Sequence, residues 1–339
     1  MVSEIDKLVK SLQKEYGSLK VASDDSIPKE LISTGIKSLD LILEGGIAWG
    51  HVAEYTGLSS SGKTTLMQML LSNAQKKYNA IGVWLDREKA WSNDRAKRLG
   101  IDLDNVMIIN PENIPSAIEA SKFLEKVLSK INKDVYKFIA IDSISAFDDP
   151  LSIDKIDMGK RASQFHRFFR KIIPNIDERA SLNISNHITY KPGIVYGNPK
   201  TTAGGESPKY YSSFRIELNE LHDIIDKDKG DEEVGNWIKA TVIKTRRGPN
   251  FRKVEFPHFY KEGIPYLGGY ERLLVNRNIL IPKNKKLFDK FEETALLYKD
   301  KKFKMGDIET ILKEFPELNF SNYPEYNIDN QQIVEDENE

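Results

Sequence analysis

The chain has 339 residues, of which 40% are apolar, so it can bury a sizeable core in one large domain with appendages or in two domains. It contains no cysteine, which excludes a disulfide framework, cysteine-ligated zinc and thiol catalysis, and its net charge of −1 leaves only local basic patches for any contact with nucleic acid. No apolar run approaches the length of a membrane span and no N-terminal signal sequence is visible, so we expect a cytoplasmic protein without membrane contact.

Residues 1–30 begin the chain with a short predicted helix and a polar connector. One apolar stripe at helical spacing is formed by Ile5, Leu8, Val9, Leu12 and Tyr16. The stripe can pack on the core of the same chain or dock on a neighbouring subunit, and the sequence favours neither.

Residues 57–65 read Gly-Leu-Ser-Ser-Ser-Gly-Lys-Thr-Thr and match the P-loop pattern G-x-x-x-x-G-K-[ST]. Glycines let the backbone curl so that its N–H groups point at an anion. Lys63 would reach the β- and γ-phosphates, and the Thr64 hydroxyl would bind Mg²⁺. A predicted strand precedes the loop and a predicted helix follows it, which is the context that phosphate binding requires. We therefore expect a nucleotide, bound by Gly57, Ser59, Ser60, Ser61, Gly62, Lys63, Thr64 and Thr65.

From residue 52 predicted strands alternate with helices, which argues for a largely parallel α/β sheet. The later strands have short connections, so the sheet should finish antiparallel, with a solvated hairpin loop at residues 226–235. After about residue 265 we expect a small, mainly helical region and an acidic tail. The predicted strands are 52–56, 80–86, 138–142, 181–188, 213–218, 237–245 and 252–260, and the predicted helices are 64–77, 92–99, 114–130, 161–176, 270–276, 285–298 and 305–315.

Two of the predicted strands end in carboxylates that could serve hydrolysis. Asp142 follows four apolar residues, and at the C-terminal end of such a strand it would lie beside the P-loop and hold Mg²⁺. An earlier strand runs into Asp86-Arg87-Glu88, where a carboxylate could act as the general base for an attacking water. An ordinary solvated loop carboxylate explains this second segment equally well.

A basic helix and a long loop are candidates for DNA binding. Residues 159–171 contain Lys160, Arg161 and Arg170 and no acidic residue. The segment 189–215 mixes Lys191 and other basic residues with tyrosines, glycines and prolines, and loops of such length are usually functional. Basic groups interleaved with flat rings suit single-stranded DNA, because cations follow phosphates and rings meet bases. The alternative is a solvated basic face with a lid.

Taken together, these motifs resemble the RecA-type homologous recombinases, which include bacterial RecA and UvsX-like phage proteins. The similarity runs from the N-terminal helix to about residue 264. It implies a RecA-like P-loop NTPase core at residues 31–265, between an N-terminal oligomerisation helix at 1–30 and a small C-terminal domain with an acidic tail at 266–339. The segments that carry it are 32–35, 38–40, 57–65, 86–88, 99–102, 141–143, 196–199 and 201–205.

The resemblance implies an ATP- and Mg²⁺-dependent DNA strand-exchange recombinase. Such a protein forms helical filaments on single-stranded DNA, pairs that DNA with a homologous duplex, and hydrolyses ATP between subunits during recombination and repair. It would act in the cytoplasm on the nucleoid, with loader or single-strand-binding proteins as further partners. Two alternatives stay open: a hexameric helicase motor on the same fold, and an ATP-binding filament or regulatory protein without useful turnover.

Roles at the nucleotide follow from the resemblance residue by residue. Glu88 matches the water-activating base, and His187 matches the γ-phosphate sensor. Lys244 and Arg246 match a basic pair that reaches the ATP of the neighbouring subunit. Arg95 aligns with a tyrosine that stacks on adenine, which leaves nucleotide selectivity open.

The resemblance also places two DNA-binding loops, at about residues 149–160 and 189–209. Tyr196 aligns with an aromatic wedge that enters the DNA. The family's arginine in the first loop aligns with Ser163, whereas Lys160 and Arg161 lie slightly earlier. The other matching positions are Met158, Gly159, Arg170, Gly204 and Gly205.

Overall fold

The computed structural model describes residues 4–16, 19, 30–147, 158–190, 200–202, 204–291, 294–299 and 301–322. The chain divides into two compact units, residues 1–30 and residues 31–339. The first unit contains helix α1 (Glu4–Tyr16), on which Ile5 and Leu8 are exposed. Within the described residues, no helix combines the length and the apolarity needed to cross a membrane.

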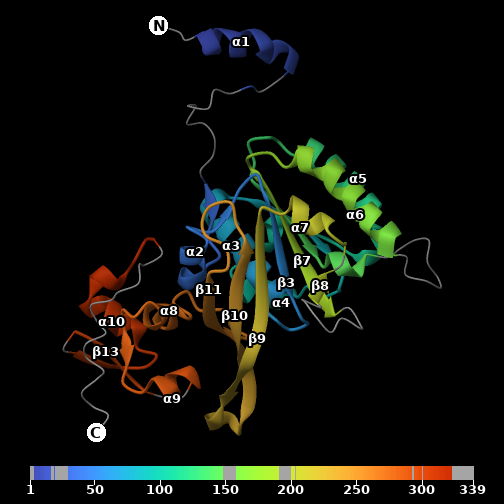
Figure 1. The fold of residues 1–339 in the computed structure, drawn as a ribbon. Coiled ribbons are helices and arrows are strands. Elements are labelled where there is room, and N and C mark those ends of the chain that lie inside the picture. The colour runs from blue at the N-terminus through green and yellow to red at the C-terminus, as the bar shows by residue number, and fades with distance from the viewer. Residues whose placement is uncertain are drawn as a thin grey trace. The chain divides into compact units, whose positions relative to one another are not determined.

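The second unit is built on a nine-stranded sheet with the order β11-β10-β9-β3-β7-β6-β4-β5, in which β8 also pairs with β7 (Figure 1). All pairs from β9 through β5 along this order are parallel, whereas β10 and β11 are antiparallel additions. The predicted α/β fold, a mostly parallel sheet that finishes in antiparallel strands, is confirmed. The strands are β3 (Val52–Gly57), β4 (Ile81–Asp86), β5 (Val106–Ile109), β6 (Lys137–Asp142), β7 (Ala180–Tyr190), β8 (Lys200–Thr202), β9 (Phe214–Asp226), β10 (Glu232–Lys244) and β11 (Lys253–Phe259).

Apolar side chains on the central strands divide between the two faces of the sheet, because neighbouring residues of a strand point to opposite sides. In β6, Phe138 and Ala140 join one core while Ile139 and Ile141 join the other. Such burial on both faces is typical of parallel strands. The helices are α2 (Lys37–Ile42), α3 (Lys63–Tyr78), α4 (Asn93–Arg98), α5 (Ala117–Lys130), α6 (Met158–Ile172), α7 (Ser207–Tyr211) and α8 (Tyr270–Asn276).

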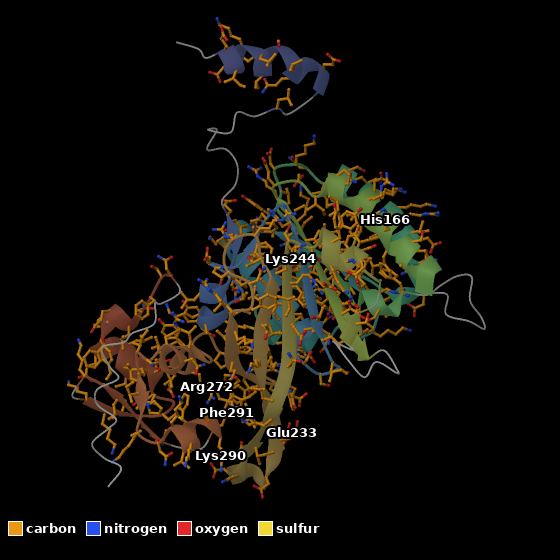
Figure 2. All side chains as sticks on the ribbon, in the orientation of Figure 1. His166, Glu233, Lys244, Arg272, Lys290 and Phe291 are labelled. Atoms are coloured by element: carbon orange, nitrogen blue, oxygen red, sulfur yellow. The ribbon has the colours of Figure 1, made fainter. Side chains whose placement is uncertain are left out.

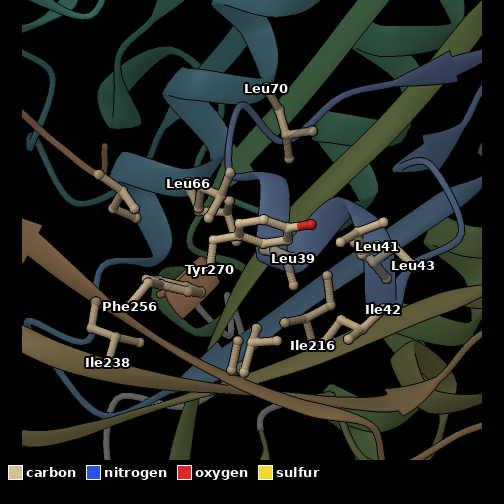
Figure 3. Packing of buried hydrophobic residues seen from close by; sticks show 14 of the residues in the cluster. Leu39, Leu41, Ile42, Leu43, Leu66, Leu70, Ile216, Ile238, Phe256 and Tyr270 are labelled. Atoms are coloured by element: carbon tan, nitrogen blue, oxygen red, sulfur yellow. The ribbon is translucent and has the colours of Figure 1, made fainter. Parts of the chain in front are cut away.

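The first core joins the part of the sheet that carries the predicted P-loop to the C-terminal region. Figure 3 shows Leu66 and Leu70 of α3 beside Tyr270 of α8 and Phe256 of β11. The second core contains the apolar sides of α5 and α6, including Leu124. Each face of the sheet therefore has its own layer of helices, and α3 packs into the first core behind the loop that precedes it.

The structure corrects three element predictions. The predicted hairpin loop at 226–235 is present but shorter: its turn covers residues 227–231, because β9 continues to Asp226 and β10 begins at Glu232, and the two strands satisfy each other's backbone groups. The sequence pattern does not predict β5, because β5 is a strand of only four residues at the edge of the sheet. The predicted helix over 285–298 is wrong in its second half, because Phe291 has a φ of 62° and the chain turns into a strand there. The C-terminal elements are β12 (Ile281–Pro282), α9 (Lys285–Asp289), β13 (Ala295–Tyr298), β14 (Lys301–Lys304) and α10 (Ile308–Glu314), with β12, β13 and β14 in one small sheet.

Candidate nucleotide site

Four parallel strands bring the predicted nucleotide-binding residues to one edge of the sheet. β3 ends at Gly57, which is paired with His187 of β7. β4 ends at Asp86, which is paired with Asp142 at the end of β6. Because β6 and β7 are neighbours, all four C-terminal ends meet. In open α/β sheets this edge is where ligands bind.

The loop between β3 and α3 depends on two glycines. Gly62 precedes α3 with a φ of 83°, and a Cβ there would lie 2.6 Å from Cδ1 of Ile238. A Cβ on Gly57 would lie 2.5 Å from the carbonyl oxygen of Leu218. A side chain at Gly57 would push the loop away from β9, and a side chain at Gly62 would be strained by the positive φ of that residue. The loop borders a cavity lined by Ser59, Ser60, Ser61, Gly62, Lys63, Thr64, Thr65, Glu88, Arg95, Asp142, His187, His258 and Tyr260.

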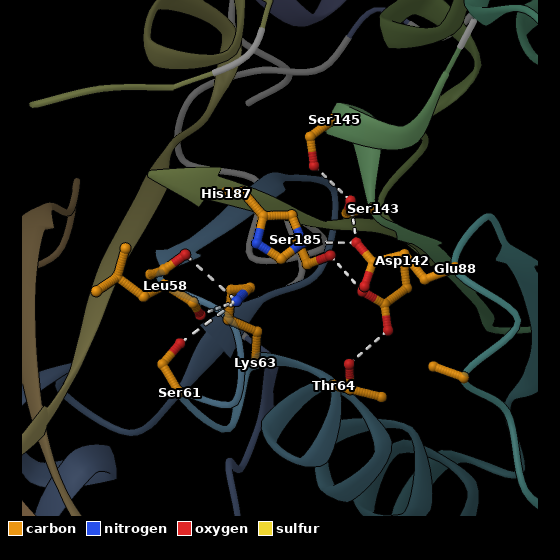
Figure 4. A network of polar contacts seen from close by, with 12 residues as sticks. Leu58, Ser61, Lys63, Thr64, Glu88, Asp142, Ser143, Ser145, Ser185 and His187 are labelled. Atoms are coloured by element: carbon orange, nitrogen blue, oxygen red, sulfur yellow. Dashed lines mark hydrogen bonds and ion pairs between the residues drawn. The ribbon is translucent and has the colours of Figure 1, made fainter. Parts of the chain in front are cut away.

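Lys63 lies in this cavity with only 6% of its surface exposed. Its ammonium group donates hydrogen bonds to the carbonyl oxygens of Leu58 at 2.6 Å and Gly57 at 3.3 Å (Figure 4). Burial lowers the pKa of Lys63, and the negative charges of Asp142 and Glu88 oppose that shift. The cation is thus held by weak neutral acceptors, which phosphate oxygens would replace with a stronger, charge-assisted contact.

Thr64 and Asp142 present oxygen atoms side by side. The Thr64 hydroxyl donates to Oδ2 of Asp142 at 2.6 Å, and Ser185 donates to the other carboxylate oxygen. Burial raises the pKa of Asp142, while the two hydroxyl groups counteract the rise. A hydroxyl and a carboxylate fit Mg²⁺, which takes few protein ligands and completes its shell with phosphate oxygens and water. Among the described residues, no group of three or more His, Asp or Glu side chains could hold a metal.

Glu88 is fixed on a turn that Asp86 organises by accepting two backbone N–H groups. One Glu88 oxygen accepts hydrogen bonds from Nε2 of His187 at 2.7 Å and from the Ser143 hydroxyl. The bond from His187 is the main reason that the pKa of Glu88 is lowered; Ser143 adds to the effect and burial opposes it. An ionised carboxylate therefore faces the cavity, in the state that a general base requires.

The structure places two residues at the cavity that the sequence did not indicate, His258 and Tyr260. His258 lies on β11, and Tyr260 follows that strand and donates a hydrogen bond to Glu233 of β10. Arg95, which the sequence did indicate, lies on α4 and donates to the Thr65 hydroxyl. No local pattern marks His258 or Tyr260, because only the tertiary packing of the last strands brings them to the P-loop.

Lys244 and Arg246 do not line the P-loop cavity of their own chain. They line a second cavity, with Gly50, His51, Tyr210 and Tyr211 among its other residues. The Lys244 ammonium donates to the carbonyl oxygens of Lys209 at 3.0 Å and Tyr210 at 3.3 Å. Burial lowers the pKa of Lys244, and the positive charges of Arg246 and Arg215 add to the shift. Figure 2 labels Lys244 at the upper part of the long strands.

Those predicted DNA-binding residues that the structure describes lie on α6 or close to it; His166 of this helix is labelled in Figure 2. Arg170 is exposed on this helix. A Cβ on Gly205 would lie 3.1 Å from Cβ of Ala162, so the end of the second loop rests on the first turns of α6. Lys191 and Tyr196 lie outside the described residues. Met158, Gly159, Lys160 and Arg161 form the first turn of α6.

His258 leads to a prediction about stability. Burial, with a smaller contribution from the charge of Arg95, lowers the pKa of His258 from 6.5 to about 4. Between those values protons bind the unfolded chain more readily than the folded one. Lowering the pH from 6.5 to about 4 should therefore reduce the free energy of unfolding by about 3 kcal/mol on account of this residue, at about 1.4 kcal/mol per pH unit. Urea denaturation of the wild type and His258→Gln across this range tests it, since their difference cancels all other groups. Parallel curves would contradict the prediction.

Comparisons with known proteins agree with the motifs and the sheet. The model of the RecA N-terminal domain matches residues 3–265. The protein RecA of Clostridium acetobutylicum is 32% identical over 285 residues, which is 81% of this chain and 79% of that protein. The protein RecA of Aquifex aeolicus is 30% identical over 325 residues, which is 93% of this chain and 89% of that protein. The chain therefore belongs to the RecA family, whose members are recombinases with DNA-dependent ATPase activity.

Proposed function

We propose that this chain is an ATP-dependent DNA strand-exchange recombinase that forms helical filaments on single-stranded DNA. One observation supports the proposal most strongly: three features line the same cavity at one edge of the sheet. They are a phosphate loop, the Thr64 and Asp142 oxygens suited to Mg²⁺, and an ionised Glu88 that is hydrogen-bonded to His187. His187 lies on β7, which runs on into the segment that holds the predicted DNA wedge. A single strand would thus connect the nucleotide site to the DNA-binding segment.

Each residue would have a defined part in hydrolysis. Lys63 and the loop N–H groups would bind and orient the phosphates, and Thr64 with Asp142 would hold Mg²⁺, which supplies charge neutralisation on the phosphates. Glu88 would orient the attacking water and take its proton. His187 would then move between Glu88 and the γ-phosphate, so that loss of this phosphate changes the position of β7 and the loop beyond it.

The second cavity and α1 support assembly of several copies. Lys244 and Arg246 cannot serve the cavity of their own chain as they stand, and a basic pair is suited to a phosphate presented by a neighbour. The exposed Ile5 and Leu8 of α1 offer an apolar surface to another copy. We therefore infer that ATP lies between subunits of the filament, with loader or single-strand-binding proteins as further partners on the nucleoid.

Electron microscopy with single-stranded DNA and a slowly hydrolysed ATP analogue tests the assembly. We expect helical filaments whose formation requires both the DNA and the analogue. Closed rings would favour a helicase motor. Dispersed particles in the presence of both the DNA and the analogue would contradict the proposed filament. The double variant Lys244→Ala/Arg246→Ala should form fewer and shorter filaments, although each subunit should fold normally.

Substitution of the predicted wedge separates a recombinase from other ATP-binding filament proteins. Tyr196→Ala should impair strand exchange far more than nucleotide affinity, because a base–aromatic contact contributes about 1–3 kcal/mol to DNA binding and none to ATP binding. The control is Tyr266→Ala, which removes an exposed aromatic ring from outside the DNA-facing segments. Strand exchange by Tyr196→Ala at the control's rate would show that this loop does not enter the DNA.

A further inference from the structure

Four side chains from four different elements form a row beside the nucleotide cavity. Arg95 of α4 donates from Nη2 to the hydroxyl of Thr65 on α3. The same hydroxyl lies 3.1 Å from Nε2 of His258 on β11. Nδ1 of His258 lies 3.0 Å from Oδ1 of Asn236 on β10. A continuous row of hydrogen bonds thus joins the last strands of the sheet to a guanidinium group in the cavity wall.

Burial fixes the direction of these bonds. Thr65, His258 and Asn236 are all at most 3% exposed, so water does not compete for their polar groups. With Oδ1 of Asn236 facing the ring, Nδ1 of His258 carries the proton and donates, and Nε2 accepts the Thr65 hydroxyl hydrogen. The oxygen of Thr65 then has its lone pairs available for Arg95. Because burial lowers the pKa of His258 to about 4, this neutral tautomer persists at neutral pH.

The residues that line the cavity fall into two chemical groups. The loop backbone, Lys63 and Thr64 suit phosphate groups and their metal ion. The others include Arg95, His258 and Tyr260, which carry flat guanidinium, imidazole and phenol groups. Planar guanidinium groups and aromatic rings stack on heteroaromatic bases. With the triphosphate on the loop, these three residues are the ones suited to the base of the nucleotide.

We propose that His258 is a positioning residue for the nucleotide base, which acts by holding Arg95 in place through Thr65. The inference rests on the proposed use of a nucleoside triphosphate at this site. An arginine on a helix surface has many rotamers, and the bond to Thr65 fixes one of them before the base arrives. Without His258, the Thr65 hydroxyl can rotate toward a backbone carbonyl of the loop that precedes α3, and the guanidinium is no longer held in one orientation.

The test compares a ligand that has a base with one that lacks it. Calorimetry in the presence of Mg²⁺ would measure the affinities for ATP and for inorganic tripolyphosphate in the wild type, His258→Ala and His258→Gln. We expect His258→Ala to weaken ATP binding about tenfold and to leave tripolyphosphate binding nearly unchanged, as the loss of one buried hydrogen bond predicts. His258→Gln supplies an acceptor oxygen near Nε2 and should recover most of the affinity for ATP.

A double-mutant cycle with Arg95→Ala shows whether His258 acts through Arg95. If it does, His258→Ala should add almost nothing to the loss that Arg95→Ala already causes. The matched control is His222→Ala, since His222 stacks on Trp237 at an interplanar angle of 18° and lies outside the cavity. The control should bind both ligands as the wild type does.

Two outcomes would overturn the inference. Equal weakening of ATP and tripolyphosphate would mean that His258 only supports the P-loop, and fully additive losses in the cycle would mean that it does not act through Arg95. Failure of the proposed function is distinguishable from both. In that case the wild type would bind neither ligand, or Lys63→Ala would bind ATP as tightly as the wild type.

Discussion

Lys63→Ala should abolish ATP hydrolysis, with a loss of at least about 100-fold in turnover and a large loss of ATP affinity. No other cation of the described residues lies in the P-loop itself, and Arg95 in the cavity wall is engaged by Thr65. Removal of a single aligned donor from a site that stabilises developing charge costs about 100- to 1,000-fold in rate. A steady-state ATPase assay with saturating single-stranded DNA, together with ATP-binding calorimetry, measures both effects.

The substitution should leave the fold intact, which makes the test decisive. Burial already lowers the pKa of Lys63, so its charge is poorly solvated in the absence of phosphate, and an alanine relieves that cost. Thermal denaturation should therefore show a melting temperature close to that of the wild type. Lys77→Ala on the same helix, where the side chain is exposed, is the matched control and should retain full activity. Full ATPase activity in a folded Lys63→Ala protein would remove the P-loop from the mechanism.

The sequence was sufficient for the half of the site that is local in the chain. Gly57 through Thr65 form one loop, and Asp142 and Glu88 follow apolar strands whose parallel pairing is predicted by the alternation of strands and helices. Their convergence follows from topology, since the C-terminal ends of neighbouring parallel strands meet at one edge. The strand ends therefore mark the candidate site without any knowledge of side-chain contacts.

The rest of the site depends on contacts that no local pattern contains. His258 reaches Thr65 only because the antiparallel strands β10 and β11 are added to the sheet next to β9, which pairs with the P-loop strand. A lone histidine in an apolar strand has the pattern of an ordinary core residue. The strand β13 was read as helix for a related reason: its short apolar run fits both periods, and pairing with β12 and β14 decides the outcome.

Glu88→Gln should slow hydrolysis on the order of 100- to 10,000-fold while ATP and DNA binding persist. The amide keeps the size of the side chain and can still accept a hydrogen bond from His187 or Ser143, but it cannot take a proton from water. Because hydrolysis releases the filament in the proposed cycle, filaments of this variant on single-stranded DNA should outlast those of the wild type. Single-turnover ATP hydrolysis and DNA dissociation kinetics measure the two effects separately.

The matched control is Glu112→Gln, since Glu112 is an exposed carboxylate whose ion pair with Lys89, at 2.7 Å, lies outside the cavity. Its turnover should equal that of the wild type.

The pH profile adds a second test, because the hydrogen bond from His187 lowers the pKa of Glu88 and keeps the base ionised as the solution becomes acidic. His187→Ala should therefore move the acidic limb of the rate profile to higher pH, where the unsupported carboxylate becomes protonated earlier. If Glu88→Gln hydrolyses ATP at the normal rate, a group other than Glu88 is the general base. The same conclusion follows if His187→Ala does not shift the acidic limb of the rate profile.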